Sequence, residues 1–186
     1  MPCDALEDVL RRLPQHRFVD QIPTPLRPWL LPIDWDRERL WSLDLPRRRI
    51  GVEELRWHLD LPWWRHDGVC FQITPRQFQA HPAAYPEHAR RVADADLSYP
   101  LHVVLRRGRW LILDGIHRLT KAEMLGHEDL PALTLTPAQI AAIARPDGRR
   151  QAYAAAPAGS AAGSSMRRGS SVSRAITRRW IWEVPS

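Results

Sequence analysis

The residues best suited to chemistry lie together in residues 110–119, which read Trp-Leu-Ile-Leu-Asp-Gly-Ile-His-Arg-Leu. An apolar run ends at Asp114, Gly115 permits a tight reversal, and His117 and Arg118 follow in the first turn of an expected helix. The unpaired N–H groups and the positive dipole end of a helix start attract anions. Because a guanidinium can grip phosphate or carboxylate with two hydrogen bonds, the segment predicts an anion site.

Each polar side chain of this segment admits a functional and a structural role. His117 can donate a hydrogen bond or exchange a proton near neutral pH, and Asp114 can hold Mg²⁺ beside a nucleotide or orient Arg118. Lys121 lies one helical turn beyond His117 and can extend the positive surface. The structural alternative is that Asp114 only caps the helix and that His117 is an ordinary surface residue.

Alternating strands and helices are expected to position this segment. The pattern predicts strands at 41–45, 69–73, 101–105, 110–113 and 130–135, and helices at 52–59, 75–80, 86–95, 116–125 and 138–144. A tight turn at 106–109 makes a hairpin of two strands, and Gly126 ends the helix that follows the site. This order predicts an α/β or α+β domain, and we favour an α+β fold with a small mixed sheet flanked by helices.

Composition divides the chain into three parts. Residues 1–39 form a Pro-rich arm, in which we predict a helix at 5–13 and extended chain at 22–33, with apolar side chains lying on the domain. Residues 40–144 form the domain. Residues 145–186 are rich in Ala, Gly, Ser and Arg, and we predict that they are disordered because they can bury little apolar surface.

The net charge of +6 is unevenly distributed. Residues 1–144 carry 19 basic and 19 acidic side chains, whereas residues 145–186 carry eight arginines against two carboxylates. Lys121 is the only lysine and Asn is absent, a skew that is typical of GC-rich bacterial coding sequences. The positive charge is therefore weak support for binding to nucleic acid, except through the basic tail.

Several classes of protein are disfavoured by the residues that the chain lacks. The two cysteines, Cys3 and Cys70, cannot make a disulfide scaffold or a Cys-rich zinc site. His81, His88 and His127 do not follow a known metal-ligand spacing, so we expect no metal site. No apolar run is long enough for a membrane span, and the acidic N-terminus does not resemble a secretory signal. We therefore expect a cytoplasmic protein with no membrane partner.

A stretch of about forty residues around this segment resembles the ParB/sulfiredoxin-like superfamily. The resemblance rests on a hairpin that leads into a Gly-x-His-Arg box at a helix start, followed by a return through Gly to a strand that begins near Pro. The matching residues are Tyr99–Val104, Gly108–Leu119, Lys121-Ala122, Leu125-Gly126 and Leu130–Leu133. The resemblance implies phosphate or nucleotide binding by Gly115, Ile116, His117, Arg118 and Lys121, with His117 and Asp114 as catalytic residues.

The departures from the superfamily narrow the expected activity. Sulfiredoxins have a nucleophilic Cys where this chain has Ile116, so sulfiredoxin chemistry is not expected. The Asp-Gly-x-His-Arg box is nearest to free serine kinases, which also use an upstream acidic residue; Asp44, Glu53 and Glu54 are candidates for it. Asp96 or Ser98 can point towards the anion site at residues 114–118, although the expected role of these two residues is to cap a turn.

Three hypotheses for function follow from the box and its context. The first is a protein that binds ATP, ADP or CTP, with or without Mg²⁺, and acts as a small-molecule phosphotransferase or nucleotide hydrolase. The second is a non-catalytic ligand sensor or protein-interaction module of the same fold. The third is a DNA-binding or nuclease-like protein, suggested by the superfamily and by the Arg-rich tail.

Overall fold

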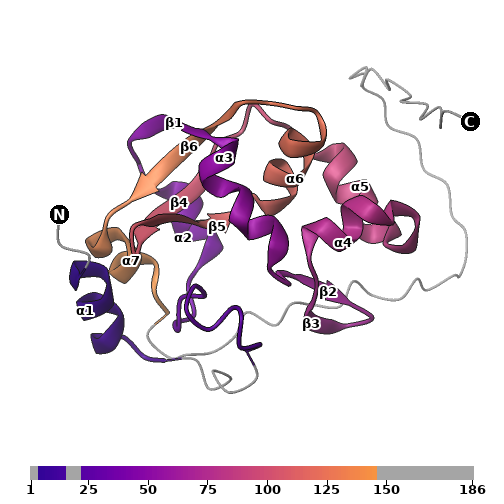
Figure 1. Cartoon of the computed structure of the whole chain (residues 1–186). Coiled ribbons are helices and arrows are strands. Elements are labelled where there is room, and N and C mark those ends of the chain that lie inside the picture. The colour runs from indigo at the N-terminus through magenta and orange to yellow at the C-terminus, as the bar shows by residue number, and fades with distance from the viewer. Residues whose placement is uncertain (1–3, 16–21, 146–186) are drawn as a thin grey trace, which may run out of the picture. The chain divides into compact units, whose positions relative to one another are not determined.

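A computed structural model describes residues 4–15 and 22–145 of the chain. The predicted tail, except Arg145, lies outside these residues. Within them the chain is a mixed α+β fold, as predicted (Figure 1). The helices are α1 (Asp4–Arg12), α2 (Arg37–Ser42), α3 (Val52–Leu55), α4 (Pro75–Ala80), α5 (Pro86–Asp94), α6 (Ile116–Met124) and α7 (Pro137–Ile143), with 3₁₀ turns η2 (Arg56–Asp60) and η3 (Pro82–Ala84). The strands are β1 (Arg47–Gly51), β2 (Trp64–His66), β3 (Val69–Ile73), β4 (Leu101–Arg106), β5 (Arg109–Asp114) and β6 (Asp129–Leu135).

The main sheet has the strand order β1-β6-β4-β5. β6 runs parallel to β4, and β1 and β5 pair antiparallel at the two edges, so the sheet is mixed. The chain passes from β4 through the hairpin to β5, crosses over by α6 and returns as β6 beside β4. This crossover places the start of α6 directly after the edge strand β5. A separate two-stranded sheet contains β2 and β3.

Apolar side chains cover both faces of the main sheet. One core cluster joins the sheet to α3, η2 and α6, around Leu55, Leu119 and Ile112. The cluster on the other face contains residues of α1, α7 and the N-terminal arm, including Leu10 and Ile140. The arm's apolar side chains therefore lie in the core of the domain, as its apolar character predicted.

Helix caps and a tight turn account for α4, α7 and the β4–β5 hairpin. Thr74 and Thr136 lie directly before α4 and α7. The side chain of each accepts a hydrogen bond from the backbone N–H of the third residue of its helix. In the β4–β5 hairpin, Arg107 and Gly108 both have positive φ, as a tight two-residue turn requires. These local signals fixed the bounds of α4, α7 and the hairpin to within a residue or two.

Two of the predicted extended segments are wrong. Residues 41–45 do not form a strand: α2 ends at Ser42, because Asp36 accepts hydrogen bonds from two N–H groups of its first turn and Leu40 is buried. Residues 22–33 are not extended throughout, since backbone bonds such as Trp29 N–H to Leu26 C=O form consecutive turns at 24–29. The prolines of the arm are compatible with turns as well as with extended chain.

Buried polar side chains tie distant elements to the sheet. Arg106 on β4 is buried and binds the carboxylate of Glu7 on α1, as well as two carbonyl groups of the arm. His58 in η2 contacts the carbonyl of Leu55 through Nδ1, and its Nε2 accepts the N–H of Ile112 on β5. Burial lowers the pKa of His58 to about 3, so this imidazole is neutral and holds the strand that leads into α6.

Candidate functional site

The predicted site lies at the junction of β5 and α6, and Gly115 makes this junction possible. Its φ is +118°, a backbone conformation that L side chains rarely adopt. A Cβ added there would lie 2.4 Å from Cδ2 of Leu101 and 2.9 Å from Nη2 of Arg118. Glycine is therefore required both by the backbone and by the side chains that close over it. Because it cannot cap α6 with a side chain, the first N–H groups of the helix are left for another acceptor.

Arg118 folds back over Gly115 and pairs with Asp114. Its Nη2 donates to Oδ2 of Asp114 at 2.8 Å, a contact that the i, i+4 spacing makes local. Both side chains are partly exposed, at 17% and 29%, so the guanidinium is oriented and still accessible. This bond uses one of the five N–H donors of the guanidinium. The geometry thus assigns Asp114 an orienting contact to Arg118, which was one of the roles expected from the sequence.

The side chain of His102 on β4 lies close to the carboxylate of this ion pair. The side chain is buried, its Nδ1 is 3.9 Å from Oδ2 of Asp114, and that nitrogen has no hydrogen-bond partner among the described residues. Burial lowers the pKa of His102, while the nearby carboxylate of Asp114 acts in the opposite direction. An unpartnered buried nitrogen beside a carboxylate is unusual in proteins and is a mark of a polar site.

His117 belongs to a hydrogen-bonded chain of two imidazoles. Nε2 of His117 is 3.1 Å from Nδ1 of His88, and Nε2 of His88 is 2.9 Å from the carbonyl oxygen of Arg65. Since a carbonyl can only accept, His88 carries its proton on Nε2 and accepts at Nδ1. His117 must then donate from Nε2, which leaves its Nδ1 as an acceptor. His88 on α5 therefore selects the tautomer of the site histidine.

The indole of Trp64 holds both imidazoles in place. It stacks on His117 and on His88 with ring centroids 4.5 Å apart in each case, and it is itself buried. Burial lowers the pKa of His117 to about 3, and nearby His88 and two arginines act in the same direction. His117 is therefore neutral at physiological pH, and proton exchange near pH 7, one role expected from the sequence, does not fit this environment.

A shallow cleft of about 390 Å³ opens at the start of α6. Beside Gly115, His117 and Arg118, it is lined by the segment that joins α5 to β4, with Asp96 and Tyr99 on its wall. Asp96 accepts the N–H of Ser98, which lowers its pKa, and the charges of Lys121 and Arg118 lower it further. The turn-capping role expected for Asp96 is thus present, and the same carboxylate also lines the cleft. The remaining lining residues are Asp94, Ala95 and Asp114.

Two of the residues expected to bind a ligand have other contacts. Nζ of Lys121 donates to the carbonyl groups of Ala93 and Ala95 at 2.7 Å, so it holds the C-terminal end of α5. The side chain of Ile116 packs against two core clusters, and only its backbone N–H is placed to meet a ligand. Lys121 therefore supports the wall of the cleft and does not line it.

The three upstream carboxylates considered from the sequence do not line the cleft. Glu53 pairs with Arg56, and Glu54 accepts the N–H of Gly51 at the start of α3, while Asp44 is exposed. The carboxylates that line it are Asp94, Asp96 and Asp114. Among the described residues no three His, Cys, Asp or Glu side chains are grouped to hold a metal ion.

Sequence reasoning missed His88, Trp64 and His102 as parts of the site. In the sequence, His88 is notable only for a metal-ligand spacing that it does not fit, and neither Trp64 nor His102 stands out as a site residue. The signal available for them was weak, since each comes from a different element and reaches His117 or Asp114 only through packing.

Comparisons of the whole chain with protein-family models, with curated proteins and with solved structures find no match.

Proposed function

We propose that this chain is a ParB/sulfiredoxin-like protein that binds the phosphates of a nucleotide at the start of α6. The observation that carries the proposal is the start of α6, which no side chain caps and over which the oriented, partly exposed guanidinium of Arg118 lies. The succession of hairpin, box, helix and parallel strand supports the relation to the superfamily. The proposed ligands are ATP, ADP or CTP, with Mg²⁺ carried on their phosphates.

In this proposal each side chain has a role set by its contacts. Arg118, oriented by Asp114, donates to phosphate oxygens together with the backbone N–H groups of the first helical turn. His117 is neutral and acts through its Nδ1 acceptor, for example on a hydroxyl of the ligand. The positive charge at the site therefore comes from Arg118 and the helix dipole, without a contribution from an imidazolium.

Tyr99 supports a nucleotide over inorganic phosphate as the ligand. It lines the cleft and its side chain is 64% exposed, so an aromatic face is available beside the phosphate site. Stacking of a base on an aromatic side chain is worth about 1–3 kcal/mol and tolerates different bases. This contact would not decide between adenine and cytosine, which agrees with a proposal that leaves the base open.

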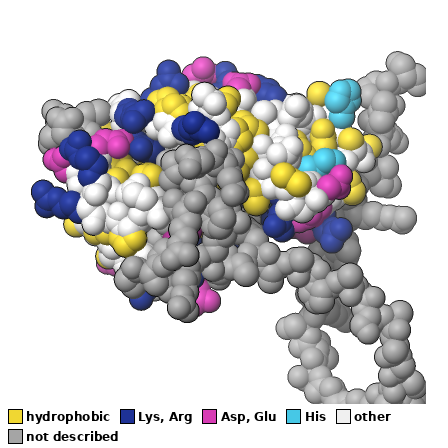
Figure 2. Space-filling view, turned by 90° about the horizontal axis from the view of Figure 1, so that it is seen from below, with side chains coloured by type: hydrophobic (Ala, Val, Ile, Leu, Met, Phe, Trp, Pro, Cys, Tyr) yellow, Lys and Arg dark blue, Asp and Glu magenta, His cyan; other side chains and the backbone are white. Residues whose placement is uncertain are grey.

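Binding of nucleic acid is less well supported. Basic side chains on the face shown in Figure 2 are interspersed with acidic and hydrophobic ones wherever the described surface is visible. We therefore keep DNA binding as an outcome of the test below and do not propose it.

Within the described residues, no helix is both long and apolar enough to span a bilayer.

The test is calorimetric titration of the full chain with ATP, ADP, CTP and pyrophosphate in the presence of Mg²⁺. Replacing Arg118 by Ala removes a charged hydrogen bond worth about 1.5–3 kcal/mol, so we expect affinity to fall roughly 10- to 100-fold. Arg118→Lys keeps the charge without the forked donors and should recover only part of the loss. Arg39→Ala removes an exposed arginine from α2 and serves as the matched control. Wild-type affinity in Arg118→Ala would refute the proposal.

Turnover is a separate question with its own measurement. If the site transfers or hydrolyses a phosphoryl group, positioning and charge stabilisation provide most of the catalysis. Release of phosphate that persists in the Arg39→Ala control and disappears in His117→Ala would identify an enzyme. Binding without product in the wild-type chain would instead identify a ligand sensor. A duplex DNA titration with strong salt dependence would support the nucleic-acid alternative.

A further inference from the structure

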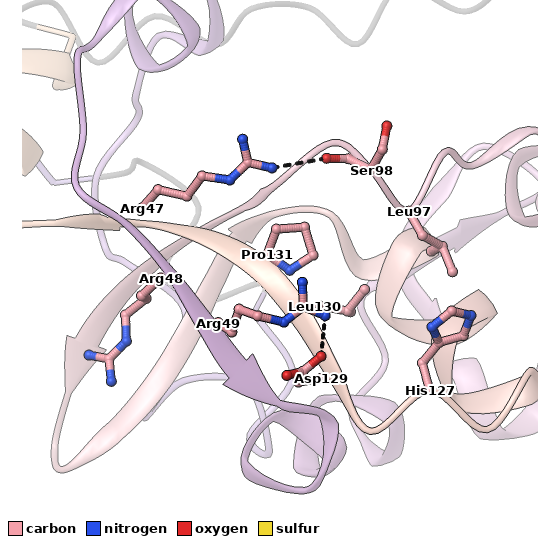
Figure 3. Close-up of a pocket in the computed structure, with 9 residues that line it drawn as sticks. All are labelled: Arg47, Arg48, Arg49, Leu97, Ser98, His127, Asp129, Leu130 and Pro131. Carbon is pink, nitrogen blue, oxygen red and sulfur yellow. Dashed lines mark hydrogen bonds and ion pairs between the residues drawn. The ribbon is translucent and has the colours of Figure 1, made fainter.

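A second cavity lies beside the edge strand β1, on the other side of the segment that joins α5 to β4. It is a groove of about 590 Å³, larger than the cleft at α6 (Figure 3). Asp96 and Tyr99 of the joining segment line the α6 cleft, whereas Leu97 and Ser98 line the groove. The groove is thus separate from the proposed nucleotide site. Its other lining residues are Arg47, Arg48, Arg49, His127, Asp129, Leu130 and Pro131.

Two guanidinium groups are presented to this groove by one strand. Arg47 and Arg49 are two residues apart on β1, so their side chains leave the same face of the sheet. Nη2 of Arg47 donates to the carbonyl oxygen of Ser98 at 3.3 Å, while Arg49 is paired with Asp129 (Figure 3). A carbonyl orients Arg47 without neutralising it. Of the three arginines on the lining, Arg49 is compensated by Asp129, Arg48 lies over the ring of Trp110, and Arg47 has no carboxylate partner among the described residues. The imidazole of His127 also belongs to the lining.

The lining also has an apolar part. Leu97 is half-buried and Pro131 is buried, and both belong to the groove together with the arginines. A ligand that fits this lining carries an anionic group at one end and an apolar or planar body at the other. Phosphate is favoured over carboxylate, because a dianion can engage two guanidinium groups at once.

We propose that this groove binds a small phosphomonoester, with Arg47 and Arg49 on the phosphate and with Leu97 and Pro131 against its organic part. The proposal does not rest on the nucleotide site, since the two cavities use different cations. The structural alternative is that an arginine-rich edge strand only discourages pairing with other sheets. That alternative predicts no binding of phosphomonoesters at β1.

The test is a titration of the ¹⁵N-labelled full chain with phenyl phosphate, followed by NMR, with inorganic phosphate and phenol as partial ligands. We expect the amide signals of Ser98 and Asp129 to shift, phenyl phosphate to bind more tightly than inorganic phosphate, and phenol to cause no shift. The double variant Arg47→Ala/Arg49→Ala should weaken binding at least tenfold. Arg39→Ala, which removes one exposed arginine from α2, should not change it.

Two further results keep the test decisive. Arg118→Ala should leave the shifts at Ser98 and Asp129 unchanged, which separates the groove from the α6 cleft. If the double variant does not fold, the single variant Arg47→Gln, at an exposed edge position, should still weaken binding severalfold. The proposal is overturned if wild-type Ser98 and Asp129 signals do not move at millimolar phenyl phosphate. It is equally overturned if the folded arginine variants bind as the wild type does.

Discussion

Replacing Gly115 by Ala tests the reasoning about the site through stability and binding together. The substitution adds a Cβ at a φ of +118°, where an L residue is strained by roughly 1–2 kcal/mol. It also places that Cβ 2.4 Å from Cδ2 of Leu101, a core side chain that is fully buried. Overpacking of this kind typically costs about 1–3 kcal/mol. We therefore expect the free energy of unfolding to fall by about 2–5 kcal/mol.

Gly108 offers a matched control for the backbone part of this cost. Its φ is +74°, and a Cβ there would have no heavy atom within 4 Å beyond the adjacent residues of the chain. Gly108→Ala should therefore lose only the conformational contribution, roughly 1–2 kcal/mol. The difference between the two alanine variants measures the crowding against Leu101 and Arg118. Urea denaturation followed by circular dichroism gives both free energies.

The crowding can also be tested by a double-mutant cycle. Leu101→Val shortens the side chain that the new Cβ would meet, so Gly115→Ala should cost less in the Leu101→Val background than in the wild type. Gly115→Ala should in addition weaken pyrophosphate binding, because Nη2 of Arg118 must move away from a Cβ at 2.9 Å. Equal destabilisation by the two alanine variants, together with unchanged pyrophosphate affinity, would refute the reasoning.

Three other predictions follow from the contacts of single side chains. The pKa of His58 is lowered to about 3 from about 6.5, so the neutral imidazole contributes to the free energy of unfolding fully above pH 6.5, and this contribution is lost as the pH falls towards 3. Urea titrations should show a loss of about 2 kcal/mol by pH 5. A pH dependence of stability that is unchanged in His58→Gln would contradict this prediction. His88→Phe keeps a ring beside Trp64 and removes the acceptor that fixes the tautomer of His117, so ATP affinity should fall roughly two- to tenfold by calorimetry, whereas His88→Gln should retain most of it. Tyr99→Ala should weaken ATP binding roughly five- to 100-fold and leave tripolyphosphate affinity unchanged, with Tyr99→Phe close to the wild type; parallel losses for both ligands would exclude base stacking.

The local part of the fold was predictable because its signals lie within a few residues of one another. The Thr-Pro helix starts, the hairpin with its glycine and the helix ended by Gly126 all follow from backbone preferences that neighbouring residues express directly. The errors fell where the local signal was ambiguous. Alternation at 41–45 suits a strand, yet capping by Asp36 and burial of Leu40 make the preceding residues helical. Conversely, the edge strand β1 was not predicted, because three successive arginines give it no alternation of apolar and polar residues. Its pairing with β6 depends on residues about eighty positions away.

By itself, the sequence determined the box at the start of α6. The glycine, the arginine and the aspartate four residues before it lie within one turn of chain, so the sequence predicted the helix start and gave the ion pair as one of two roles for Asp114. Only the tertiary structure decided the state of His117. Its tautomer is set by His88, 29 residues upstream, and its low pKa by burial against Trp64, because hydrogen bonding and desolvation depend on which side chains the fold brings together.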